Sequence, residues 1–264
     1  MANTLRNKRL LKTEKHLIDN MNYKSYSVYD DDDFFDKYNQ KRSKGNSPNE
    51  LIEQPIIDEL IGDINGKRIL DLGCGDGEYG VELLKRGAKH YHGIEGSQKM
   101  SGLAKENLKG YDSIIEVGDI EWVEFEKVKY DIVVSRLVLH YIEDVGRLLK
   151  RIRESLNEEG EFIFSIEHPI ITSCYESYHK EVKRGNWIVD NYFEAGERVN
   201  IWIGKNVVKY HKPLEDYWRI IKKSNLEVIE IRESKPQASN FEIREEFERR
   251  DRVPLFLMFK LKNK

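Results

Sequence analysis

Acidic residues and glycines stand close together in the segment Asp71-Leu-Gly-Cys-Gly-Asp-Gly77, where they could hold a small charged ligand. Glycines at alternating positions let a loop turn sharply and let a ligand approach the backbone closely. A second acid, Glu95, follows 24 residues after Asp71, and a carboxylate at this offset can accept hydrogen bonds from both hydroxyls of a ribose. A third acid, Asp119, lies farther along the chain. The spacing predicts a site for a ligand that contains a nucleoside.

The elements around these acids are predicted to bring them together. Strand-like runs at 67–72, 90–95 and 113–117 each end within two residues of one acid, and helix-like runs at 79–86 and 98–108 separate the strands. Strands that alternate with helices in this way form right-handed βαβ units and a parallel sheet. Because ligands of open α/β sheets bind at the carboxyl edge, we expect all three acids to face one site.

The rest of the chain continues the same pattern. Further helices are predicted at 49–61, 146–156 and 213–223, and further strands at 130–135, 161–166, 226–231 and 254–260. The last two strands are joined by a long loop without an obvious helix, which predicts a β-hairpin and an antiparallel last strand. The predicted fold is α/β, with a doubly wound, seven-stranded Rossmann-like sheet.

The 264 residues, at about 150 per domain, allow roughly 1.8 domains. Residues 1–48 are predicted to form an N-terminal extension and lid, because the aromatic cluster at 23–38 must pack on something. The first stretch, 1–28, is predicted as a terminal helix with a solvated face. Residues 49–264 form the main domain, and the regular pattern breaks down at about 168–212, which we interpret as an inserted substrate cap.

Composition excludes several classes of protein. Two cysteines, Cys74 and Cys174, cannot form a disulfide framework and lack the spacing of a zinc site. No apolar run approaches the ~20 residues of a membrane span, and no signal peptide is recognisable. The net charge, 44 − 47 = −3, gives no global attraction to nucleic acid or to anionic membranes. We expect a cytoplasmic protein without a bound metal, a membrane partner or a nucleic-acid partner.

The glycine loop has two interpretations. Gly75-x-Gly77-x-x-Gly80 matches the dinucleotide fingerprint, whereas Asp71-x-Gly73-x-Gly75-x-Gly77 resembles motif I of class I S-adenosylmethionine-dependent methyltransferases. The carboxylate of Asp71 would repel a pyrophosphate, but it suits the α-ammonium group of a methionyl moiety. The resemblance covers about residues 55–262 and is closest to the small-molecule branch, in particular to a generic subgroup of bacterial enzymes with segments like 167–170 and 210–217.

The resemblance implies S-adenosylmethionine as the cofactor and S-adenosylhomocysteine as the product. It also implies that Asp119 meets the adenine amino group, that Ile120 packs on the adenine ring, and that Tyr38 and Arg42 cover the methionyl end. The full set of predicted cofactor contacts is Tyr38, Arg42, Asp71, Gly73, Cys74, Gly75, Gly77, Glu95, Gly96, Ser97, Met100, Asp119, Ile120, Ser135 and Arg136.

Catalytic residues are weakly specified, because the sulfonium already activates the methyl group and the protein mainly positions the reactants. A general base is needed only where the acceptor must lose a proton. The candidate bases are His140, Glu167, His168 and His211. Enzymes of this fold that methylate adenine N6, cytosine N4 or glutamine amides carry Asp/Asn-Pro-Pro-aromatic after the fourth strand, and residues 135–138 read Ser-Arg-Leu-Val instead.

The predicted function is methyl transfer to an oxygen or nitrogen of a small metabolite. Aromatic residues of the cap would suit a flat or cationic acceptor. The alternatives are an RNA-modifying methyltransferase, a non-catalytic S-adenosylmethionine-binding regulatory protein, and a nicotinamide oxidoreductase, which Asp71 disfavours. We expect a small-molecule partner and a monomer or homodimer.

Overall fold

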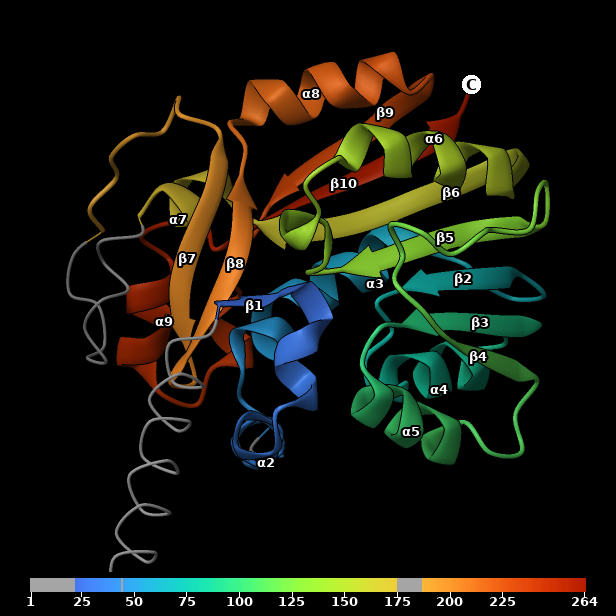
Figure 1. Ribbon diagram of the computed structural model, residues 1–264, viewed down its shortest axis with the longest axis horizontal. Coiled ribbons are helices and arrows are strands. Elements are labelled where there is room, and N and C mark those ends of the chain that lie inside the picture. Colours follow the sequence, from blue (N-terminus) through green and yellow to red (C-terminus); the bar gives the residue numbers. More distant parts are fainter. Residues whose placement is uncertain (1–21, 44, 175–186) are drawn as a thin grey trace, which may run out of the picture.

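The computed structural model describes residues 22–43, 45–174 and 187–264. The predicted terminal helix at 1–28 lies largely outside the described residues. The main sheet has the strand order β4-β3-β2-β5-β6-β10-β9 (Figure 1). Its strands, in that order, are Ser113–Val117, His90–Glu95, Arg68–Leu72, Tyr130–Arg136, Leu156–Glu167, Phe256–Asn263 and Leu226–Glu233.

The strand pairing confirms the predicted topology. Strands β4, β3, β2, β5 and β6 are parallel to their neighbours, and β10 is antiparallel to both β6 and β9. The doubly wound, seven-stranded sheet with an antiparallel last strand is therefore confirmed.

The connection between the last two strands differs from the prediction. It contains the helix α9 (Arg244–Arg250), where the sequence suggested a loop without an obvious helix. This helix buries none of its own residues, so it has no apolar periodicity to reveal it. It carries ion pairs instead, with Arg244 Nε 2.7 Å from Glu248 Oε1 and Arg249 Nη2 2.7 Å from Glu246 Oε2.

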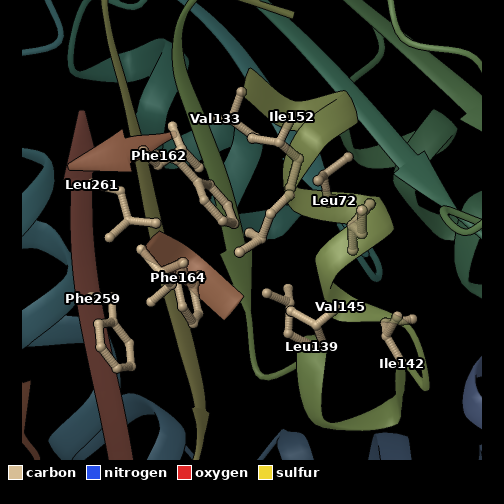
Figure 2. Close-up of a cluster of buried hydrophobic side chains, with 14 of the residues drawn as sticks. Leu72, Val133, Leu139, Ile142, Val145, Ile152, Phe162, Phe164, Phe259 and Leu261 are labelled. Atoms are coloured by element: carbon tan, nitrogen blue, oxygen red, sulfur yellow. The ribbon is translucent and has the colours of Figure 1, made fainter. Parts of the chain in front are cut away.

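Helices cover both faces of the sheet (Figure 1). On one face lie α6 (Val145–Ser155) and α8 (Leu214–Lys223), and their apolar residues join a core that includes stacked Phe162 and Phe164, with ring centroids 5.0 Å apart (Figure 2). On the other face lie α3, α4 and α5, which span Gln54–Ile61, Glu78–Lys85 and Gln98–Asn107. A π-helical turn, η2 (Asn49–Glu53), leads into α3.

A second, three-stranded sheet of order β1-β8-β7 joins the predicted lid to the predicted cap. The hairpin β7 (Gly196–Trp202) and β8 (Lys205–His211) is antiparallel, and β1 (Asn22–Lys24) pairs with β8 in parallel. From here on, the lid denotes residues 22–43, and the cap denotes the described parts of 168–212. The lid continues through η1 (Ser25–Asp30) into α2 (Asp32–Arg42).

The lid and the cap pack on each other through aromatic rings. The ring centroid of Phe34 lies 5.1 Å from that of Trp202 in the cap, and the rings of Tyr29 and Tyr38 each lie 5.8 Å from the same tryptophan. Asp31 reinforces this contact, because it accepts a hydrogen bond from Tyr23 at 2.8 Å and lies 3.1 Å from Lys205 Nζ. The cap residues at 175–186 lie outside the described part of the chain. Within the described part, no helix combines the length and the apolar character that a membrane span requires.

Candidate active site

The glycine loop turns sharply between β2 and α4. Gly73, Gly75 and Gly77 have φ values of +79°, +59° and +74°, in the left-handed region that favours glycine. A Cβ added at Gly73 would lie 2.4 Å from Cγ2 of Val138, so the loop packs directly on the segment after β5. The N–H of Gly73 donates to the carbonyl of Ile94 at 2.8 Å, which fixes the loop to the end of β3.

Glu95 ends β3 with a buried, oriented carboxylate. Its Oε2 accepts the N–H of Gly75 at 2.9 Å, and its Oε1 accepts the N–H of Ser97 at 2.8 Å. Burial raises the pKa of Glu95, and these backbone hydrogen bonds oppose that shift. Ser97 in turn caps α5 by accepting the N–H of Met100 at 3.2 Å. The carboxylate therefore ties the glycine loop to α5 and keeps lone pairs for a further donor.

Asp71 lies buried beside Glu95 at the neighbouring strand end, because β2 and β3 pair in register with Asp71 opposite Gly93. The phenol of Tyr91 donates to its Oδ2 at 2.8 Å. Burial raises the pKa of Asp71 to about 6, while the Tyr91 hydrogen bond and the Arg136 guanidinium act in the opposite direction.

Asp119 and Ile120 follow β4, the next strand along the same edge. Asp119 Oδ1 accepts the N–H of Glu121 at 2.9 Å, which holds the turn that buries Ile120. Tyr26 of the lid lies near Asp119. Burial, together with the negative charge of this acid, raises the pKa of the Tyr26 phenol. The three acids therefore lie at three adjacent strand ends.

The lid helix α2 reaches the glycine loop. Arg42 Nη2 lies 3.0 Å from Asp76 Oδ1, and Arg42 Nη1 donates to the hydroxyl of Tyr38 at 3.3 Å. At the other end of the lid, Asp30 accepts the hydroxyl hydrogen of Ser97 at 2.7 Å. The lid thus contacts both the glycine loop and the start of α5.

The comparisons with known proteins agree with this geometry. The methyltransferase-domain profile matches residues 70–164, from β2 to β6. An uncharacterized protein of Haemophilus influenzae is 34% identical over 197 residues, which are 70% of this chain and 77% of that protein. A Listeria monocytogenes protein, assigned as an S-adenosylmethionine-dependent methyltransferase, is 30% identical with a TM-score of 0.73, over 80% of this chain and 96% of its own.

The chain belongs to the class I S-adenosylmethionine-dependent methyltransferases. A methyltransferase structure from Mesorhizobium loti is similar to the same degree, at 29% identity and a TM-score of 0.73, over 80% of this chain and 97% of its own. S-adenosylmethionine is the methyl donor of the family, and the strand edge of this methyltransferase fits it. Glu95 offers a buried carboxylate that two backbone N–H groups already orient, with lone pairs left for the hydroxyls of a ribose.

Several predicted cofactor residues are engaged within the methyltransferase itself. Ser135 donates its hydroxyl hydrogen to the carbonyl of Leu72 at 2.9 Å and so joins β5 to β2. Arg136 pairs with Glu53, with Nη2 2.6 Å from Oε2, and lies 4.2 Å from the ring centroid of Tyr79. Cys74 and Met100 are buried beneath the loop. Contact of any of the fifteen residues with the cofactor stays a prediction.

Two of the four candidate bases come together. His140, in the 3₁₀ turn η3 (Leu139–Tyr141), is buried, and this burial lowers its pKa to about 3. Its Nδ1 accepts the N–H of Glu167 at 3.3 Å, so the neutral ring carries its proton on Nε2. Glu167 Oε1 lies 2.6 Å from Lys209 Nζ. These contacts favour a donor role for His140 and leave Glu167 as the candidate proton acceptor.

The other two candidates hold the cap in place. His168 precedes α7 (Pro169–Ser173), and its Nδ1 accepts the N–H of Ile170 at 3.1 Å while Nε2 lies 3.1 Å from Glu233 Oε1. His211 contacts the hydroxyl of Thr172 at 2.6 Å through Nδ1 and the carbonyl of Tyr192 at 2.8 Å through Nε2. Both rings therefore use both nitrogens in contacts that stabilise the fold.

Sequence reasoning missed Lys209 and Glu53. Lys209 lies two residues before His211 on β8, and side chains two apart in a strand share a face. Lys209 therefore lies on the same buried face of β8 as His211. Its Nζ is 5.5 Å from the ring centroid of Tyr141 and 6.0 Å from that of Trp202. Glu53 stands among buried isoleucines just before α3, and an acid inside an apolar run is a signal for a buried partner.

Asp71 should give the ligand-free methyltransferase a pH-dependent stability. Its folded-state pKa of about 6 lies above the ordinary 3.8, so the stability from its proton is complete below about pH 3.8 and is lost as the pH rises through 6. We expect Asp71→Asn to raise the free energy of unfolding by about 3 kcal/mol at pH 7 and to flatten its pH dependence. Urea unfolding between about pH 4 and pH 8 measures this, and a variant that parallels the natural protein at every pH would contradict it.

Proposed function

We propose that this methyltransferase methylates an oxygen or nitrogen of a small-molecule acceptor bound between the lid and the cap. The observation that supports this most directly is a hollow of about 220 Å³ at the place where lid, cap and strand edge meet. Its lining comes from the lid, from Asp119 and Glu121, from Tyr141, and from Val208 and Tyr210 of the cap. The hollow is smaller than the roughly 300–1,000 Å³ of pockets for drug-sized ligands, and its mixture of charged and aromatic residues suits a small amphiphilic molecule.

The chain's own residues would act mainly by positioning. When bound, S-adenosylmethionine supplies a methyl group that its sulfonium already activates. Glu95 and the glycine loop would hold the nucleoside, because the carboxylate is fixed by two backbone donors before any ligand arrives. The Nε2–H of His140 provides a neutral donor, and the lid with the cap excludes water from the strand edge.

Glu167 is the candidate proton acceptor where the acceptor molecule must lose a proton. The Lys209 ammonium, 2.6 Å away, keeps this carboxylate ionised and so available as a base, and the same cation makes it a weaker base than an unpaired carboxylate. Tyr141 lies beside this pair, with its ring 4.3 Å from His140 and 5.5 Å from Lys209 Nζ. Tyr141 also lines the hollow, so His140 and the Glu167–Lys209 pair lie close to one wall of the proposed acceptor site.

Release of S-adenosylhomocysteine across a metabolite panel tests the proposal. We expect turnover with a hydroxylated or amino-bearing metabolite and none with bulk tRNA. Tryptophan-fluorescence or calorimetric binding of S-adenosylhomocysteine without turnover on either class would favour the regulatory alternative. Robust turnover on tRNA alone would favour the RNA-modifying alternative and overturn the small-molecule assignment.

A further inference from the structure

Tyr26 bridges two strand ends of the cofactor site. It belongs to η1 of the lid, and its ring rests on Gly96, because a Cβ added there would lie 2.2 Å from Cδ1 of Tyr26. Its phenol lies near Asp119, whose negative charge adds to burial in raising the pKa of Tyr26, and both side chains line the same hollow. One side chain of the lid therefore runs from the backbone after Glu95 to the acid after β4.

These are the positions assigned to the adenosine. Under the proposed function, Glu95 holds the ribose and Asp119 accepts the adenine amino group. A phenol that lies on Gly96 with its hydroxyl near Asp119 places a flat ring and a hydrogen-bond donor where that amino-bearing ring is predicted to bind. We propose that Tyr26 occupies the adenine end of the cofactor site in the ligand-free enzyme and must leave before S-adenosylmethionine binds. This inference rests on the proposed roles of Glu95 and Asp119.

The surroundings of Tyr26 allow such a movement. The ring borders the hollow of about 220 Å³, so free space lies on its outer side. Ser25, the preceding residue, has a φ of +49°, in a region that is strained for a residue with a Cβ. The chain is fixed on both sides of Tyr26: β1 pairs with β8 before it, and Asp30 after it accepts a hydrogen bond from the Ser97 hydroxyl at 2.7 Å. A rotation of the tyrosine side chain would therefore be confined to η1.

Displacement of Tyr26 also reaches the acceptor pocket. Because Tyr26 already lines the hollow together with Tyr141 and Tyr210, a movement of its ring away from Gly96 changes the shape of that hollow. The cofactor then has to bind first, and the acceptor pocket takes its final shape afterwards. A closed form that competes with the cofactor lowers its apparent affinity in proportion to the open fraction.

The variant Tyr26→Phe keeps the ring and removes the hydroxyl near Asp119. We expect S-adenosylhomocysteine, measured by calorimetry, to bind about tenfold more tightly to Tyr26→Phe than to the natural enzyme, and its stopped-flow association to be faster by a similar factor. Tyr26→Ala should show a gain at least as large. The matched control is Tyr111→Phe, because Tyr111 lies exposed after α5, and it should leave both quantities unchanged.

Unchanged or weaker binding by Tyr26→Phe would overturn the inference, and weaker binding would show that the phenol contacts the bound cofactor. Glu95→Ala measured alongside separates this failure from that of the proposed site. If Glu95→Ala loses affinity while Tyr26→Phe gains none, the site assignment stands and only the competition by Tyr26 is wrong. If Glu95→Ala binds as the natural enzyme does, the assignment of the adenosine site itself fails.

Discussion

Replacing Glu95 with alanine should weaken the binding of S-adenosylmethionine and S-adenosylhomocysteine by about 10²–10³-fold. The carboxylate is predicted to accept hydrogen bonds from both ribose hydroxyls, and hydrogen bonds to a charged group contribute about 1.5–3 kcal/mol each. A loss of about 3–4 kcal/mol corresponds to this change in affinity. Calorimetry with S-adenosylhomocysteine measures it directly, because that ligand does not turn over.

The structure adds a second reason for a large effect. Glu95 accepts the N–H groups of Gly75 and Ser97, so its removal also frees the glycine loop from the start of α5. Glu95→Gln keeps the side-chain shape but loses the charge, and we expect an intermediate affinity. Glu106→Ala, an exposed glutamate on α5, is the matched control and should bind normally.

Thermal unfolding of the three variants separates a lost contact from a lost fold. Burial raises the pKa of the Glu95 carboxyl, so its removal relieves a buried charge in the ligand-free enzyme, while the two backbone donors lose their acceptor. These effects oppose each other, and we expect a small net change in Tm. An affinity of Glu95→Ala within threefold of the natural enzyme, with an intact fold, would refute the ribose assignment.

The cofactor edge was predictable because its signals are local. Each strand of the first half is a short apolar run that ends at a glycine or an acid, so the positions of Asp71, Glu95 and Asp119 followed from the alternation of strands and helices. The pairing of β2, β3 and β4 in adjacent register then places these acids side by side. No long-range information was needed beyond the rule for parallel sheets.

The contacts of the lid and the cap were not predictable in the same way. The three residues of β1 pair with β8, which begins at Lys205, and nothing in a three-residue strand identifies a partner so far along the chain. Nothing in the sequence distinguishes Tyr26 from the neighbouring aromatic residues, and its contact with Gly96 appears only in the structure. Local pattern reveals that such residues are buried, but only the tertiary structure reveals what they touch.

The chemistry of the candidate bases depended on the same long-range contacts. The sequence alone allows His140 to act either as a base or as a hydrogen-bond donor. The backbone N–H of Glu167, 27 residues away, donates to Nδ1 and so fixes the tautomer. His168 and His211 were identified by their types, yet contacts with Glu233 and Tyr192 commit them to the fold. Residue type indicates what a side chain could do, and burial with its partners determines which role is left.

Removing Glu53 should destabilise the enzyme by about 3–5 kcal/mol, the cost of leaving a buried cation without its partner. The fully buried Glu53 carboxylate lies 2.6 Å from Arg136 Nη2, accepts from Arg136 Nε at 3.1 Å, and accepts from Ser165 at 2.6 Å. Glu53→Ala leaves the guanidinium packed on the ring of Tyr79, at 4.2 Å, without its ion-pair partner. For a domain of typical stability, about 5–15 kcal/mol, this is a large fraction of the total.

Urea unfolding of single and double variants isolates the pair. Glu53→Met combined with Arg136→Met removes both charges and fills the space with apolar atoms, so we expect it to recover most of the loss, as replacement of a buried pair often does. Glu248→Ala breaks the exposed pair with Arg244 at 2.7 Å and should cost less than about 1 kcal/mol. If Glu53→Ala lost no more unfolding free energy than Glu248→Ala, the prediction would be wrong. Water or another polar group would then have to solvate the Arg136 guanidinium, because a buried charge without a partner is otherwise costly.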